Sequence, residues 1–143
     1  MQSGWQPSGK RLRKDLNRIL SNSISVFDTK RINGEKENSY HNLLVGILTG
    51  NAEWLVKSNI EAGEGFADII VETDDPDAGI VIELKYVKSF NEMEQACQKA
   101  LTQIHERHYQ EYLLNDNRKD IRLYGIAFCK KRCKAMTEVL PVK

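Results

Sequence analysis

Gly79-Ile80-Val81-Ile82-Glu83-Leu84-Lys85 is the segment of this chain that most constrains its architecture and its chemistry. Its first four residues are apolar or small and suit the interior of a β-sheet, but the run ends in charged side chains. Because residues i and i+2 of a strand point to the same face, Glu83 and Lys85 should emerge side by side. The segment therefore predicts a buried strand with a carboxylate and an ammonium group at one end.

The length and composition indicate one ordinary globular domain. The chain has 143 residues, and its N-terminus lacks the apolar segment of a secretory signal. No apolar stretch approaches the roughly 18 residues that a membrane span needs. We therefore expect a cytoplasmic protein with no membrane association, whose three cysteines stay reduced.

Charge is distributed unevenly, although the formal net charge is only +1. Both ends of the chain are basic, whereas residues 37–82 hold one basic side chain against nine acids. The basic runs Lys10–Lys14 and Lys130–Lys134 suit a phosphate backbone, and the acidic centre suits divalent cations. For either basic run taken alone, an ordinary solvated surface is the alternative.

The apolar spacing predicts helices and strands in one α/β domain over residues 35–143. Residues 1–34 are expected to be a helical leader or a linker remnant. Periodicity and turn-forming residues predict helices over 37–49 and 91–114, strands over 52–61, 66–73, 79–87 and 121–128, and a short edge strand over 136–139. The first three strands should form a meander, and His108 should lie on the packed side of the second helix.

Asp68 lies near the start of one predicted strand, and Glu83 and Lys85 lie near the end of the next predicted strand. If these two strands form an antiparallel hairpin, Asp68, Glu83 and Lys85 come together. Two neighbouring carboxylates repel each other unless a cation neutralises them, and hard oxygen ligands suit Mg²⁺ or Mn²⁺. Such an ion could activate a water against a phosphodiester, with Lys85 orienting the water or stabilising charge at phosphorus. A simple ion pair between Glu83 and Lys85 is the alternative.

The ordered series of segments resembles the PD-(D/E)xK nuclease superfamily over about residues 37–134. The segments similar to the branch usually found C-terminal to an AAA-type ATPase domain are Glu37–His41, Ser58–Gly65, Ala67–Ile70, Ile82–Lys85, Ala100–Ile104 and Tyr124–Cys129. The resemblance implies a restriction-endonuclease-like core, with a mixed central β-sheet flanked by α-helices. It also implies a deoxyribonuclease that uses Mg²⁺ or Mn²⁺.

The resemblance also implies a role for each residue of the catalytic set. Asp68 and Glu83 would bind the metal, with the backbone carbonyl of Leu84 as a third ligand. Lys85 would be the catalytic lysine, and Glu37 on the first helix would reach the metal through water. For Glu37, the alternative is an acid that complements the helix dipole.

Two further residues are implied to lie near the substrate. His41 follows Glu37 by one helical turn on the same face, and Gln103 matches a glutamine of related nucleases. A packed or solvent-exposed histidine and a glutamine that bonds neighbouring backbone are the alternatives. Phe66 departs from the family pattern, which often has arginine or another polar residue after the second glycine of this turn.

The expected partners follow from the same resemblance. They are DNA, a second copy of the chain if both strands are cut symmetrically, and an AAA-type ATPase domain on the same or a partner chain. This sequence has no G-x-x-x-x-G-K-[ST] motif, so it is either a fragment or a stand-alone domain. A catalytically silent nucleic-acid- or protein-binding module and a structural dimerisation domain stay open as other functions.

Overall fold

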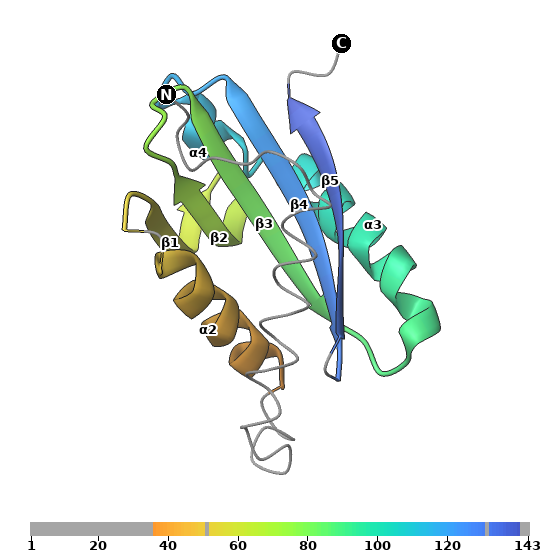
Figure 1. The fold of residues 1–143 in the computed structure, drawn as a ribbon. Helices are drawn as coiled ribbons and strands as arrows, with labels where there is room; N and C mark the ends of the chain where they lie inside the picture. The colour runs from red at the N-terminus through yellow and green to blue at the C-terminus, as the bar shows by residue number, and fades with distance from the viewer. Residues whose placement is uncertain (1–35, 51, 131, 141–143) are drawn as a thin grey trace.

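A computed structural model describes residues 36–50, 52–130 and 132–140 and gives a five-stranded mixed sheet with helices on both faces (Figure 1). The elements follow the chain in the order α2 (Lys36–Thr49), β1 (Leu55–Ala62), β2 (Gly65–Glu72), β3 (Ala78–Tyr86), the 3-10 helix η1 (Phe90–Glu92), α3 (Met93–Arg107), α4 (Glu111–Leu114), β4 (Asp120–Cys129) and β5 (Arg132–Leu140). The predicted α/β class, with a mixed central sheet flanked by helices, is confirmed.

The strands lie in the order β1-β2-β3-β4-β5. Among the strands of the described part, β3 and β4 pair in parallel, from Ala78 opposite Asp120 to Tyr86 opposite Phe128, and the other neighbours are antiparallel. A parallel pair needs a long crossover connection, which η1, α3 and α4 supply. Because helices cover both faces of these central strands, β3 and β4 are almost continuously apolar.

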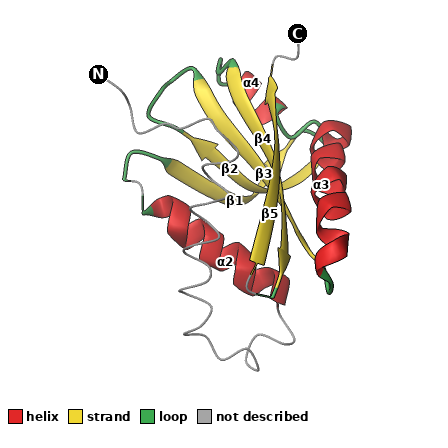
Figure 2. Cartoon of the chain, turned by 45° about the vertical axis from the view of Figure 1, so that its right-hand side comes forward, coloured by secondary structure: helices red, strands yellow, loops and turns green. Residues whose placement is uncertain are grey.

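Three hydrophobic clusters of the described residues hold the helices against the sheet, with α2 on one face and α3 and α4 on the other (Figure 2). On the first face, Leu44 of α2 packs in one cluster with Ile82 of β3. On the second face, Ile104 of α3 packs with Val81 of β3 and Leu123 of β4. Alternation along β3 thus sends successive side chains into different layers.

The single helix predicted over 91–114 is wrong, because the structure divides this segment. α3 ends at Arg107, and His108 adopts the left-handed conformation with φ 58°. This cap turns the chain so that Tyr109 and Leu113 become buried. His108 itself is exposed and lies 3.4 Å from the carboxylate of Glu64, so its predicted packed position is also wrong.

The last strand is longer than the predicted edge strand at 136–139. β5 begins at Arg132 and pairs with β4 along its whole length, after a turn in which Lys130 has φ 55°. The basic run Lys130–Lys134 weakens the strand signal in this part of the sequence, although Cys133 within the run is buried. The tertiary partner β4 therefore overrides a weak local strand signal.

Some expectations fall outside the described residues, namely the leader over 1–34 and the basic run Lys10–Lys14, and these stay predictions. Within the part that the structure describes, no helix is long and apolar enough to cross a bilayer. Cys97, Cys129 and Cys133 are all buried.

Candidate functional site

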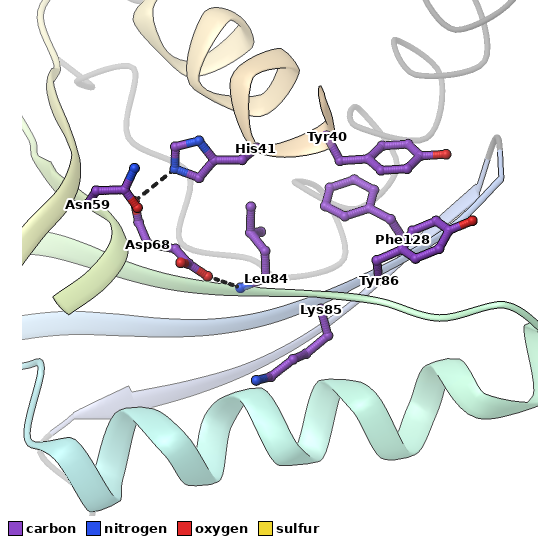
Figure 3. Close-up of a pocket in the computed structure, with 8 residues that line it drawn as sticks. All are labelled: Tyr40, His41, Asn59, Asp68, Leu84, Lys85, Tyr86 and Phe128. Atoms are coloured by element: carbon purple, nitrogen blue, oxygen red, sulfur yellow. Dashed lines mark hydrogen bonds between the residues drawn. The ribbon is translucent and has the colours of Figure 1, made fainter. Parts of the chain in front are cut away.

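Asp68 lies where β2 separates from β3. The two strands are antiparallel, as predicted, and their pairing reaches Ile69 opposite Ile82. Beyond that pair, the backbone N–H of Leu84 donates a hydrogen bond of 2.8 Å to Oδ2 of Asp68 (Figure 3). A side-chain carboxylate thus takes the place of the next backbone acceptor in the ladder, and Asp68 is brought beside the charged end of β3.

The backbone of Leu84 also orients its own carbonyl. In a strand, the N–H and C=O of one residue point to the same side, which is why paired antiparallel residues exchange both bonds. Since the N–H of Leu84 points to Asp68, the carbonyl oxygen faces the same opening between β2 and β3. The predicted third metal ligand is therefore on the side where the carboxylate of Asp68 lies.

Glu83 is a buried acid, with 4% of its surface exposed. Burial first, and then the charge of Asp68, raise the pKa of Glu83 to about 8, although Lys85 acts in the opposite direction. Its Oε1 atom is buried and has no hydrogen-bond partner in the described part of the chain. A buried carboxylate oxygen without a partner is costly, so this atom needs a ligand or a proton.

The donor set fits a hard divalent cation. Asp68 and Glu83 supply carboxylate oxygens, and Leu84 supplies a carbonyl oxygen, which are the ligand types that Mg²⁺ and Mn²⁺ prefer. Among the described side chains, which do not include that of Glu37, no group of three or more His, Cys, Asp or Glu could hold a metal ion. A metal at this position would therefore keep several water ligands, as Mg²⁺ usually does.

Lys85 is positioned by α3. Its Nζ donates a hydrogen bond of 2.7 Å to Oε1 of Gln103, and Nε2 of Gln103 donates one of 3.2 Å to the hydroxyl of Tyr109. Gln103, predicted to lie near the substrate, thus contacts the lysine directly. Tyr109 was missed, because nothing in the sequence separates this buried tyrosine from an ordinary core aromatic residue.

His41 contacts the backbone of the Asp68 segment. Its Nε2 lies 3.1 Å from the carbonyl oxygen of Asp68, so the ring donates to that oxygen. Opposite Asp68 in β1, Asn59 has φ 51°, a left-handed conformation that asparagine tolerates better than most residues. Sequence reasoning did not find Asn59. Glu37 lies in α2, but its side chain is outside the described part, so its role stays a prediction.

A cavity of about 90 Å³ lies beside Asp68 and Lys85, and the buried Glu83 is not among its lining residues. Its lining residues are Tyr40, His41, Asn59, Asp68, Leu84, Lys85, Tyr86 and Phe128 (Figure 3). The ring of Tyr40 stacks on Phe128 and Tyr86, with centroids 4.8 and 5.7 Å away. Burial raises the pKa of Tyr40 to about 12, so this wall stays uncharged and strengthens electrostatic interactions beside the carboxylates.

The chain belongs to the PD-(D/E)XK nuclease superfamily. The model of this family matches residues 35–138, and the five-stranded mixed sheet is consistent with a restriction-endonuclease-like fold. Among solved structures, the chain is similar to one described as the crystal structure of SSO0001, with 22% identity and a TM-score of 0.42. The match covers 94% of this chain and 64% of that one, so the chain spans less than two thirds of that structure. The search of curated proteins finds no match.

Proposed function

We propose that this nuclease-like domain is a Mg²⁺-dependent deoxyribonuclease, with Mn²⁺ as a substitute ion. The observation that carries the proposal is the buried Glu83 carboxyl group beside the carboxylate of Asp68, because no described residue forms a hydrogen bond with its Oε1. A structural ion pair alone would not require a second acid, the half-buried Asp68, beside the buried Glu83, because the repulsion between two carboxylates destabilises the fold.

Asp68, Glu83 and the Leu84 carbonyl would hold the ion. When bound, it supplies polarisation of a phosphoryl oxygen and a lowered pKa for a coordinated water. Asp68 keeps its geometry through the hydrogen bond from the Leu84 N–H, which leaves its other carboxylate oxygen for the ion. His41 holds the Asp68 carbonyl and so positions this segment, in addition to its predicted place near the substrate.

Lys85 would stabilise the negative charge that develops on the phosphoryl group during hydrolysis. Gln103 and Tyr109 hold its ammonium group in one orientation before the substrate arrives, which lowers the reorganisation needed in the transition state. Lys85 also lines the cavity that holds Asp68, so the lysine residue borders the place where a phosphate bound to the ion would lie.

The test is incubation with linear, circular and single-stranded DNA in Mg²⁺ or Mn²⁺. We expect cleavage by the wild type, loss of cleavage in Glu83→Gln, and cleavage at the wild-type rate in Glu61→Gln, which changes an exposed acid of β1. If the wild type neither cuts DNA nor binds either ion in calorimetry, the proposal is wrong. DNA binding without hydrolysis would instead indicate a catalytically silent module that retains the fold.

The finer expectations belong to the same proposal. The segments quoted above support the branch that is fused C-terminal to an AAA-type ATPase domain, which would then be a partner on a longer or a separate chain. Symmetric cutting of both strands would need a homodimer. We also propose that the protein acts on DNA in the cytoplasm.

A further inference from the structure

We propose that one face of α3 binds the phosphate backbone of the nucleic acid where the backbone leaves the site of Asp68 and Glu83. Lys99 and Arg107 are the cationic contacts on this face. This inference rests on the proposed function, because it assigns the path of the substrate through the same site. A second depression of about 580 Å³ lies along α3. Lys85 lines both this depression and the smaller cavity with Asp68 and is the residue that the two linings share.

The direction of Lys85 supports this path. Figure 3 shows its side chain leaving β3 toward α3, whereas His41 and Asp68 lie on the other side of the ribbon. The ammonium group ends at Gln103 on α3, at a distance of 2.7 Å. A phosphate beside Lys85 is therefore at the start of the α3 depression.

Along α3, one cation lies about one helical turn before Gln103, the residue that contacts Lys85, and another lies about one turn after it. Lys99, Gln103 and Arg107 occupy positions i, i+4 and i+8, which form one stripe on a helix. Each step of four residues rises about 6 Å along the axis, close to the separation of consecutive phosphates in an extended strand. All three residues line the depression, and Thr102 adds a hydroxyl donor to it.

The two outer cations are available for a ligand. Within the described ranges, neither Lys99 nor Arg107 has a carboxylate within 4.0 Å. Elsewhere in those ranges, basic side chains paired with acids are found at Lys57, Arg118, Arg122 and Lys134. The lining of the depression holds three cations, counting Lys85, and one acid, Glu106, and its other members are glutamines and Thr102. Unpaired cations and neutral donors suit a polyanion that offers only acceptors.

A second exposed basic surface competes for the same role. Lys130 and Arg132 lie over the ring of Phe90, with the Arg132 guanidinium carbon 4.6 Å from its centroid. Neither cation lines the α3 depression or the cavity at Asp68. This surface therefore provides a matched pair of cations for comparison.

The experiment measures DNA affinity over a salt series with Ca²⁺ in place of Mg²⁺, together with steady-state hydrolysis in Mg²⁺. Lys99→Gln with Arg107→Gln is compared with Lys130→Gln with Arg132→Gln, and with Lys119→Gln, an exposed lysine outside both depressions. We expect the α3 pair to weaken binding and raise KM with kcat unchanged. The slope of log K against log salt should fall by about 0.7–0.9 for each lost contact. Mg²⁺ affinity and the melting temperature should match those of the wild type.

The outcomes separate this inference from the proposed function. An unchanged slope and KM in the α3 pair, in a wild type that cuts DNA, would overturn the path along α3 and leave the nuclease proposal standing. A loss confined to the Lys130 and Arg132 pair, or a wild type that binds no DNA, would also overturn it. Binding that depends on the α3 pair without any hydrolysis would support the path and reject the nuclease proposal.

Discussion

Replacing Glu83 by glutamine tests whether burial beside Asp68 makes this carboxyl group costly to the metal-free fold. Glutamine has nearly the same shape, carries no charge and can donate to the Asp68 carboxylate. The folded-state pKa of Glu83 is raised from 4.5 to about 8, so the folded protein retains a proton that the unfolded chain has already lost in this range. Stability must therefore fall as pH rises through the window from 4.5 to about 8.

The magnitude follows from the size of the shift. One pKa unit corresponds to about 1.4 kcal/mol, so the wild type should lose unfolding free energy on the order of 5 kcal/mol across the window. Glu83→Gln lacks the titrating group and should show a flatter profile. At about pH 8 the variant should be the more stable protein, whereas below pH 4.5 the two should be similar.

The assay is urea unfolding in the presence of a chelator, followed by tryptophan fluorescence at a series of pH values. Glu61→Gln, which removes an exposed acid from β1, serves as the matched control and should keep the wild-type pH dependence. Parallel profiles for wild type and Glu83→Gln would refute the reasoning, as would a variant that is less stable at about pH 8.

The remaining predictions concern the ion, the lysine and the contact between sheet and helix. Because Glu83 is mostly protonated below its pKa of about 8, Mg²⁺ binding near pH 7 should release about one proton; calorimetry in buffers of different ionisation enthalpy would contradict this if none is released. Lys85→Met should lower kcat for DNA cleavage by about 10²–10³-fold without weakening Mg²⁺ binding, and a variant as fast as the wild type in single-turnover assays would reject the assigned role. A Cβ at Gly125 of β4 would overlap the carbonyl oxygen of Cys97 in α3, so Gly125→Ala should cost about 1–3 kcal/mol in denaturant unfolding, and an unchanged midpoint would contradict this close approach.

Local sequence patterns were sufficient for the first three strands of the sheet and for the hairpin of β2 and β3. The alternation and turn signals between residues 52 and 87 predicted the meander of β1, β2 and β3, since hairpin neighbours in sequence are neighbours in space. The break at His108 and the extent of β5 were not predictable. Both depend on partners distant in sequence, because the left-handed cap lets Tyr109 and Leu113 reach the core and β4 supplies the ladder for β5.

For the site, local sequence was enough to predict which charged groups lie at the end of β3 and, through the alternation of side chains and the hairpin, that Asp68 lies beside them. These are local properties of an extended chain. Three features depend on packing between distant segments. Glu83 is buried and its Oε1 has no partner among the described residues. Gln103 and Tyr109 hold Lys85, and His41 contacts the Asp68 carbonyl. Burial and these contacts arise when α2 and α3 close over opposite faces of the sheet, and no spacing within one strand or helix records that packing.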